Sequence, residues 1–168
     1  MEHVYWDEIM VENRSLLIAW TDRGLCYVGS FIETFEHLCL WQEKYIPEAE
    51  VVRYQGNNVY TEQIFQYFNE QRMQFDLPID LKGTAFQLNV WQQLSKIPYG
   101  KTVTYSYIAK EINNPKAVRA VGRAIGQNPV AIVIPCHRVI GKNGTLTGFR
   151  GGLEMKEVLL ELEKSVVL

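Results

Sequence analysis

A thiol and an imidazole stand side by side in the stretch VAIVIPCHRV, residues 130–139, as Cys136 and His137. The apolar run at residues 130–134 predicts a short buried strand, which should end before Cys136 because Pro135 cannot donate to a strand ladder. The sulfur would then face a cleft. A cysteine beside a histidine is typical of an activated nucleophile, although free cysteines are more often inert core residues. The neighbouring sequence has to decide between catalysis and packing.

Two short helices joined by a turn are predicted on the N-terminal side of this stretch. Residues 104–112 have the pattern of one helix, and Asn113 and Asn114 have that of a turn. Pro115 suits the first turn of a second helix that extends to about Gln127. A helix-turn-helix of this kind is a DNA-binding arrangement.

The second of these helices is both basic and rich in small residues. Arg119 and Arg123 are four residues apart, and Ala120 and Gly122 would let the helix backbone approach another surface closely. Each glycine costs roughly 1 kcal/mol of helix propensity relative to alanine. Close helix packing inside the protein needs the same small residues, but the two arginines favour a phosphate or base partner.

The charge is divided unevenly along the chain. The first 81 residues carry five Lys and Arg against fourteen Asp and Glu, whereas the chain from Lys82 onward carries twelve against five, a net charge of +7. The basic half could therefore meet nucleic acid.

Compartment and cofactors follow from the remaining composition. Three cysteines form no even-numbered disulfide framework, which fits a reducing compartment, and no apolar segment approaches the length of a leader or a membrane span. We expect a cytoplasmic protein with no membrane partner. His3, Cys26, His37 and Cys39 were weighed as zinc ligands, but their spacing matches no standard pair and favours apolar packing, so no metal site is predicted.

A change of pattern near residue 80 predicts two domains, 1–80 and 81–168. The first reads as an α+β scaffold domain with a hairpin at residues 14–31. Its further elements would be helices at residues 33–45 and 59–72 and strands at residues 51–54 and 73–77. The second domain would hold a helix capped by Thr84, the helix-turn-helix, the Cys-His stretch and a C-terminal helix from about residue 152 to Glu163.

Glu163 is the acid that could complete a catalytic set. If its carboxylate reaches His137, it can fix the imidazole tautomer and stabilise the imidazolium, which in turn favours a thiolate on Cys136.

Taken together, motifs between residues 83 and 163 resemble the O6-methylguanine-DNA methyltransferase family in order and spacing. The matching segments are Phe86-Gln87, Val90-Trp91, Ile97-Pro98-Tyr99-Gly100, Arg119-Ala120-Val121-Gly122, Asn128-Pro129, Ile134-Pro135-Cys136-His137-Arg138-Val139 and Gly151-Gly152-Leu153. The resemblance implies an N-terminal ribonuclease H-like α/β domain and a mostly helical C-terminal domain with a winged-helix-like helix-turn-helix.

The resemblance also implies the activity. A thiolate of Cys136 would take the alkyl group from guanine O6 in double-stranded DNA, once and irreversibly, without a cofactor, and the protein would act as a monomer. O4-alkylthymine is a further candidate substrate. The nucleotide has to be rotated out of the stack, at a cost of a few kcal/mol, and the helix-turn-helix would approach from the minor groove.

Site residues are carried over from the family by their motif positions. His137 would activate Cys136 through a water, Glu163 would hold His137, Tyr105 would give a proton to the departing guanine, and Asn128 would support the turn. Arg119 would enter the gap left by the rotated nucleotide. The other implied DNA contacts are Ala120, Gly122, Arg123, Tyr105 and Arg138, and the implied substrate pocket is Val139, Phe149, Arg150 and Gly151. Phe149 departs from many members, which have Tyr there.

Two other function classes fit parts of the sequence. A lesion-binding or regulatory DNA-binding relative would not transfer the alkyl group, but relatives of that kind lack the acceptor cysteine. A cysteine hydrolase would use Cys136, His137 and Glu163 with repeated turnover.

Overall fold

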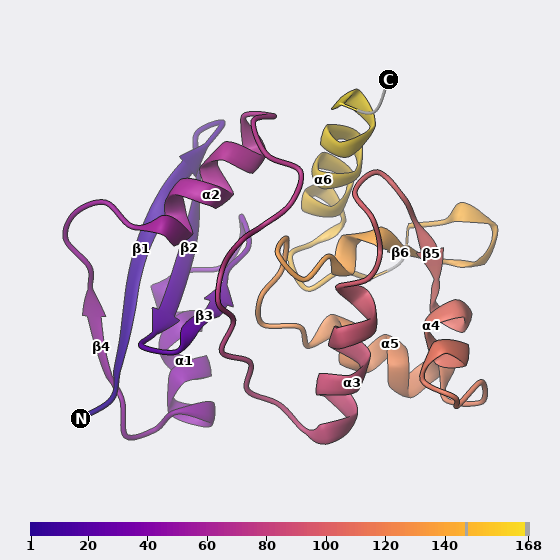
Figure 1. Cartoon of the computed structure of the whole chain (residues 1–168), viewed down its shortest axis with the longest axis horizontal. Helices are drawn as coiled ribbons and strands as arrows, with labels where there is room; N and C mark the ends of the chain where they lie inside the picture. The colour runs from indigo at the N-terminus through magenta and orange to yellow at the C-terminus, as the bar shows by residue number, and fades with distance from the viewer. Residues whose placement is uncertain (147, 167–168) are drawn as a thin grey trace. The chain divides into compact units, whose positions relative to one another are not determined.

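The chain divides into two compact units, Met1–Lys82 and Gly83–Leu168. The computed structural model describes residues 1–146 and 148–166, the last two of these by their backbone alone. Both units mix helices with strands, and the predicted α+β class is confirmed (Figure 1). None of the described helices combines the length and the apolar character that a membrane crossing requires.

The first unit is built on a four-stranded sheet in the order β3-β2-β1-β4. β1 (His3–Val11), β2 (Arg14–Thr21) and β3 (Gly24–Val28) are antiparallel, and β4 (Glu50–Arg53) pairs parallel with β1. Helices α1 (Phe35–Tyr45) and α2 (Val59–Phe68) cover the two faces of the sheet (Figure 1). Because both faces are covered, the central strand β2 is almost wholly buried and reads as a continuous apolar run.

The predicted hairpin, both helices and the strand near residue 51 are confirmed in this unit, but one strand was not predicted and one predicted strand is absent. β1 was not foreseen; its turn into β2 uses Glu12 and Asn13, both at positive φ, as two-residue hairpin turns require. The strand predicted at residues 73–77 was wrong. The backbone of Asp76 binds a side chain there instead of a neighbouring strand. Nε2 of Gln63 donates to the carbonyl of Asp76, and Oε1 of Gln63 accepts the amide of Asp76.

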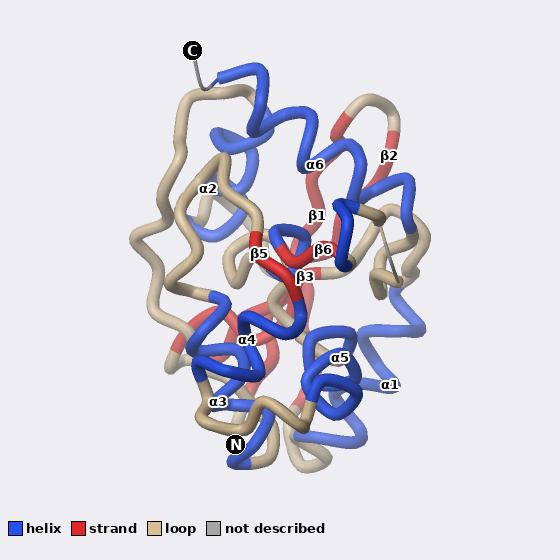
Figure 2. The backbone as a smooth tube through the Cα atoms, turned by 90° about the vertical axis from the view of Figure 1, so that its right-hand side faces the viewer, coloured by secondary structure: helices blue, strands red, loops and turns tan. Residues whose placement is uncertain are grey.

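The second unit consists of helices around one very short strand pair. α3 (Ala85–Leu94), α4 (Tyr105–Glu111) and α5 (Val118–Gly126) are followed by a 3₁₀ turn, η1 (Cys136–Arg138), a second one, η2 (Lys142–Gly144), and α6 (Leu153–Val166). β5 (Val103–Thr104) and β6 (Val139–Ile140) run parallel, side by side, in Figure 2. Trp91 of α3 is buried, and its indole N–H donates to the carbonyl of Ala124 at 2.8 Å, which joins α3 to α5.

Local sequence explains where these helices begin. Thr84 caps α3 through a capping box with Gln87, and Thr104 caps α4. The second helix of the predicted helix-turn-helix starts later than expected, at Val118 instead of Pro115. A turn closed by the amide of Ala117 and the carbonyl of Asn114, 3.0 Å apart, precedes it.

The strand predicted at residues 130–134 is absent, although the segment is buried almost throughout. The backbone turns on itself instead, with the amide of Ile134 bonded to the carbonyl of Val130 at 3.0 Å and Ile132 at φ 74°. A short apolar run predicts burial and leaves the backbone conformation open.

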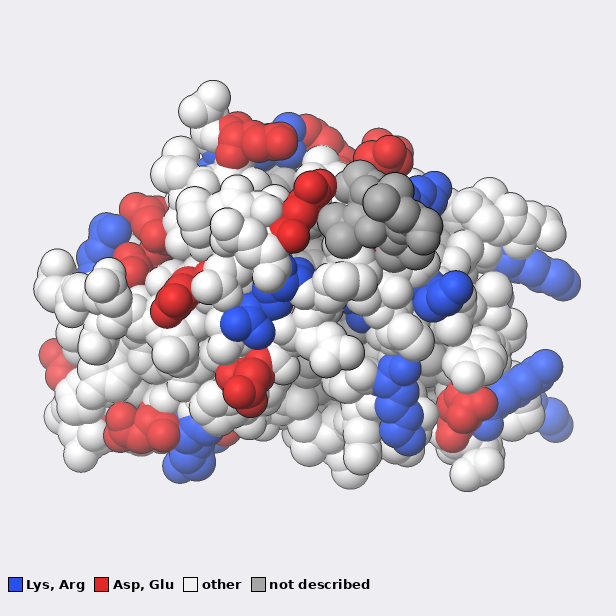
Figure 3. Space-filling model, turned by 45° about the horizontal axis from the view of Figure 1, so that its top comes forward, with Lys and Arg blue, Asp and Glu red and all other residues white. Residues whose placement is uncertain are grey.

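Charged side chains of both signs are interspersed on the face of the molecule drawn in Figure 3. Within the described residues, no three His, Cys, Asp or Glu side chains are grouped so that they could hold a metal ion. Two of the weighed zinc ligands have other roles: Cys26 lies in the core of the first unit, and His37 accepts the amide of Thr34 at the start of α1.

Candidate active site and nucleic-acid interface

Cys136 and His137 lie on the buried 3₁₀ turn η1. Cys136 is 5% exposed and His137 is fully buried. The turn is anchored on both sides: the amide of Cys136 donates to the carbonyl of Ile134 at 2.8 Å, and Val139, directly after the turn, pairs with Val103 in the β5/β6 ladder. The expected position of the thiol at a strand end is therefore replaced by a position at the start of a 3₁₀ turn.

Asn128 holds the strained turn that precedes the thiol. Its Nδ2 donates to the carbonyl of Ile134 at 2.8 Å, and its Oδ1 accepts the amide of Val130 at 3.0 Å. Ile132 lies between them in the left-handed region, where a β-branched residue carries strain of about 1–3 kcal/mol. The buried amide side chain of Asn128 thus stabilises a conformation of the backbone at residues 130–134 that is unfavourable without these hydrogen bonds.

Glu163 of α6 reaches into the same site. One carboxylate oxygen, Oε2, lies 2.6 Å from Nε2 of His137, so the contact hypothesised from the sequence is present. The other oxygen, Oε1, accepts the amide of Gly100 at 3.2 Å. Glu163 is 1% exposed, and a buried carboxylate of this kind needs several donors.

Arg138 supplies two of those donors, which corrects its expected role as a DNA contact. Its Nε and Nη2 donate to the two carboxylate oxygens of Glu163 at 2.9 and 3.0 Å, and Nη1 donates to the carbonyl of Ile97 at 2.6 Å. The guanidinium is buried and points into the protein. A phosphate outside cannot reach it, because its fork is already occupied by a carboxylate.

Burial sets the resting ionisation of the Cys-His pair. Burial raises the pKa of the Cys136 thiol, while a hydrogen bond from Asn128 and the positive charges of Arg150 and Lys156 act in the opposite direction. Burial also lowers the pKa of His137 and outweighs the attraction of Glu163, with Arg138 and Lys156 lowering it further. The resting imidazole is therefore neutral, and the imidazolium expected from the sequence is not the resting form.

A neutral imidazole beside Glu163 has a defined tautomer. The carboxylate accepts the proton on Nε2, which leaves a lone pair on Nδ1. Nδ1 of His137 is buried and has no hydrogen-bond partner among the described residues. This nitrogen is consequently the basic atom that the site can offer to an acidic proton.

Lys156 of α6 is a site residue that sequence reasoning missed. Its side chain is fully buried, and Nζ donates to the carbonyl of Val139 at 2.7 Å. Its charge favours the thiolate of Cys136. The spacing held a usable signal, because Lys156 is seven residues before Glu163 and two turns of helix place both on one face.

The residues assigned to a substrate pocket lie on β6 and on the segment that leads into α6. Val139 and Gly151 are buried, whereas Phe149 and Arg150 are half-buried. The carbonyl of Phe149 accepts the amide of Gly152 at 2.9 Å and closes the turn into α6. Arg150 is near enough to Cys136 for its charge to lower the thiol pKa.

The helix-turn-helix presents an open, basic surface. Arg119, Ala120 and Arg123 of α5 are exposed. Gly122 lies beside Tyr105 of α4, where an added Cβ would make an ordinary contact with the ring at 3.8 Å, so the packing of the two helices does not require glycine at this position.

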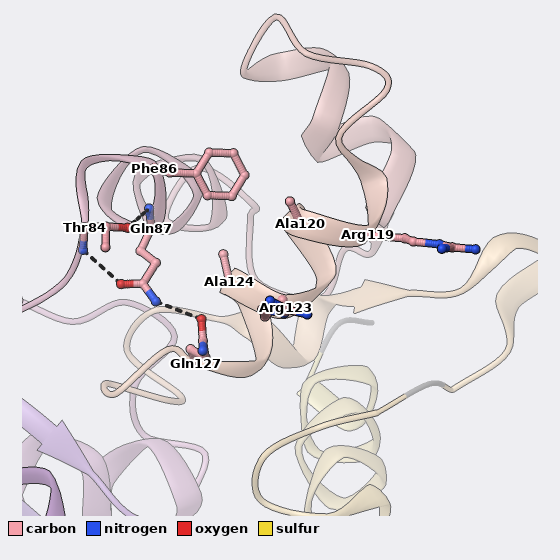
Figure 4. Close-up of a pocket in the computed structure, with 8 residues that line it drawn as sticks. All are labelled: Thr84, Phe86, Gln87, Arg119, Ala120, Arg123, Ala124 and Gln127. Carbon is pink, nitrogen blue, oxygen red and sulfur yellow. Dashed lines mark hydrogen bonds between the residues drawn. The ribbon is translucent and has the colours of Figure 1, made fainter.

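A groove of about 350 Å³ separates α5 from the start of α3 (Figure 4). Its lining residues are Thr84, Phe86, Gln87, Arg119, Ala120, Arg123, Ala124 and Gln127. Gln87 spans its base, since Nε2 donates to Oε1 of Gln127 at 2.8 Å while Oε1 accepts the amide of Thr84 at 2.9 Å. Two exposed arginines on one side of such a groove suit a polyanion.

Known proteins similar to this chain agree with this arrangement. The sequence profile described as "6-O-methylguanine DNA methyltransferase, DNA binding domain" matches residues 85–165. The inducible methylated-DNA--protein-cysteine methyltransferase of Bacillus subtilis (strain 168) is 50% identical over 96% of this chain and 90% of its own length. The methylated-DNA--protein-cysteine methyltransferase of Methanosarcina acetivorans is 44% identical over 89% of this chain and 92% of its own.

Solved structures give the same result. The crystal structure of Mycobacterium tuberculosis O6-methylguanine methyltransferase superposes with a TM-score of 0.83 at 38% identity and covers 100% of this chain and 96% of that one. The structure of Mycobacterium tuberculosis OGT in complex with DNA gives a TM-score of 0.82 at 38% identity over 96% and 94% of the two chains. The resemblance read from the motifs is confirmed, and the chain belongs to the methylated-DNA--protein-cysteine methyltransferase family, the O6-methylguanine-DNA methyltransferases.

Proposed function

We propose that this protein repairs DNA by transferring the alkyl group of O6-alkylguanine to the sulfur of its own Cys136. The observation that carries the proposal is a cysteine on a buried turn beside a histidine whose Nε2 is held at 2.6 Å by a buried carboxylate, in a chain of this family. A bond forms between Sγ and the alkyl carbon, and the bond from that carbon to O6 breaks. Because a thioether has no easily expelled leaving group, each molecule acts once.

The protons follow the hydrogen bonds of the site. The thiol proton of Cys136 passes to Nδ1 of His137 through a water, and Glu163 stabilises the imidazolium that then forms. Lys156 and Asn128 favour the thiolate. The guanine leaves as an anion and takes a proton from the hydroxyl of Tyr105. These steps need no cofactor.

The nucleic acid would be held by the helix-turn-helix. α5 would lie in the minor groove of double-stranded DNA, where Ala120 and Gly122 allow a close approach and Arg123 neutralises backbone charge. Arg119 would fill the space of the rotated nucleotide. The extruded base would enter a pocket formed by Val139, Phe149, Arg150 and Gly151. We assign the protein to the cytoplasm, acting as a monomer, with O4-alkylthymine as a further candidate substrate.

A stoichiometric titration tests the proposal. After incubation with an excess of an oligonucleotide containing O6-methylguanine, mass spectrometry should find one methyl group on the peptide that holds Cys136, and lesion consumption should stop at one per protein. Cys136→Ala should abolish transfer and keep DNA binding. Cys39→Ala, on α1 of the first unit, is the matched control and should react like the wild type.

Two results would overturn the proposal. Consumption of lesion far beyond the amount of protein would indicate a hydrolase, and binding of the lesion with no methylated peptide would indicate a recognition protein. The acceptor cysteine that such recognition relatives lack is present here, so transfer is the favoured outcome.

A further inference from the structure

The guanidinium of Arg138 occupies an interior position beside the catalytic pair. Its planar fork donates to both carboxylate oxygens of Glu163 at 2.9 and 3.0 Å, and Nη1 donates to the carbonyl of Ile97 at 2.6 Å. Its central carbon lies 5.6 Å from the ring centre of Tyr99. Every one of these contacts holds the arginine against the site.

Charged and titratable groups from three parts of the second unit face His137 or its partners. η1 contributes Cys136 and Arg138, α6 contributes Glu163 and Lys156, and the segment after α3 contributes Tyr99, whose ring lies beside the guanidinium of Arg138. Arg138 is the group that binds the same carboxylate as the imidazole.

The carboxylate of Glu163 favours the charged form of the His137 imidazole, whereas burial favours the neutral form. An opposite charge at 2.6 Å strongly favours the imidazolium, most of all in a buried site where solvent does not screen it. An imidazolium has protons on both nitrogens, so it cannot accept one from a thiol. The charge of Glu163 therefore works against the neutral base that its carboxylate orients, and a positive charge on the same carboxylate acts together with burial to keep that base neutral.

We propose that Arg138 is a positioning residue of the transfer reaction, which offsets the charge of Glu163 and fixes its carboxylate so that His137 rests as a neutral base toward Cys136. This role rests on the proposed function. It requires the two properties that distinguish arginine from lysine, a permanent charge and a rigid fork that engages both carboxylate oxygens.

Three variants separate the charge from the fork. Arg138→Gln removes the charge, Arg138→Lys keeps the charge without the fork, and the double variant Arg138→Gln/Glu163→Gln removes both members of the ion pair. The double variant also guards against a folding failure, because replacing both members of a buried pair is tolerated better than leaving one charge alone. Lys164→Gln removes an exposed positive charge next to Glu163 in sequence and is the matched control.

Two readouts are needed on the full chain. The imidazole of His137 is titrated by NMR, with its signal assigned by His137→Gln against the other two histidines. Single-turnover methyl transfer from a saturating O6-methylguanine duplex is measured across the same pH range. The titration needs no substrate, so a wild type that fails to transfer refutes the proposed function and leaves the role of Arg138 measurable.

In Arg138→Gln, the imidazole should take up its proton at a higher pH than in the wild type, and the acid side of the rate profile should move in the same direction. Near neutral pH the transfer rate should drop by about tenfold or more, within the range that a base contributes. Arg138→Lys should keep the wild-type position of the profile with a reduced maximum. The double variant should show no upward shift.

A purely structural role would lower the rate at every pH and leave both midpoints in place. That outcome in Arg138→Gln, or an upward shift that persists in the double variant, would overturn the inference. If Arg138→Gln does not fold, an upward shift in Arg138→Lys would overturn it as well, since lysine retains the charge.

Discussion

Replacing Asn128 by alanine should strongly destabilise the second unit, because this side chain is the hydrogen-bond partner of two buried backbone groups. The amide of Val130 loses its partner, the carbonyl of Ile134 keeps the amide of Cys136 but loses its second donor, and the left-handed turn at Ile132 loses its support. A buried amide left unsatisfied costs about 1–3 kcal/mol and a lost hydrogen bond about 0.5–1.5 kcal/mol, so the expected loss is roughly 1.5–4.5 kcal/mol. That is a large share of the 5–15 kcal/mol, roughly, that stabilises an ordinary domain.

The assay has to report on the second unit alone. Trp91 is the only tryptophan of that unit, and its indole is buried against Ala124. Fluorine-labelled tryptophan resolves the four indoles by NMR during a urea titration, so the Trp91 signal follows this unit. With a urea dependence of about 2 kcal/mol per molar, the midpoint should fall by at least about 0.7 M.

Asn58→Ala is the matched control. Asn58 caps α2 in the first unit by accepting the amide of Thr61 at 2.9 Å, and loss of such a cap costs about 0.5–2 kcal/mol. The Trp91 midpoint should be unchanged in that variant. A loss below about 1 kcal/mol in Asn128→Ala would refute the reasoning, since it is less than one unsatisfied buried group should cost.

Gly24→Ala should lower the free energy of unfolding of the first unit by more than about 2 kcal/mol, because φ is +143° and the added carbon would meet backbone atoms at 2.5 Å. Gly56→Ala, at φ +105° with nothing within 4 Å, should lower it by only about 1 kcal/mol. Equal urea midpoints for the two variants would contradict this expectation. Lys156→Met should slow single-turnover transfer near neutral pH by about tenfold or more and move its rise to higher pH, because its charge helps to lower the pKa of the Cys136 thiol. The free energy of unfolding of the second unit should fall as the pH drops below 6.5, by at most about 1.4 kcal/mol per pH unit, because burial lowers the pKa of His137 and only the unfolded chain takes up that proton. Urea titrations at several pH values test this. If the stability of His137→Gln falls as steeply with pH as that of the wild type, the explanation is refuted.

Much of the helical framework was predictable because its signals are local. The caps Thr84 and Thr104, and the apolar spacing that places Trp91 and Leu94 in the interior, depend on residues three or four apart. The motifs around Cys136 were enough to identify the family. These features need no knowledge of distant contacts.

The errors arose where a side-chain partner outside the local pattern decides the backbone path or the burial of a residue. The apolar segment before Cys136 was read as a strand, but the side chain of Asn128 bonds it into a turn. Arg138 was expected at DNA because an arginine in a basic unit suits phosphate, whereas Glu163, 25 residues further along the chain, binds it in the interior. Lys156 was missed for the same reason. A polar residue inside the protein is predictable only when its partners are known.

The amide of Gln87 limits which residue the capping position of α3 can hold. Glutamate is as common as glutamine in this position of a capping box and would accept the amide of Thr84 equally well. It could not, however, donate to Gln127, and its charge would stand in a groove lined by Arg119 and Arg123. A glutamate there would both untie the end of α5 from α3 and repel an incoming phosphate. A neutral side chain at residue 87 therefore allows the same residue to cap α3 and to leave the groove open to an anionic ligand.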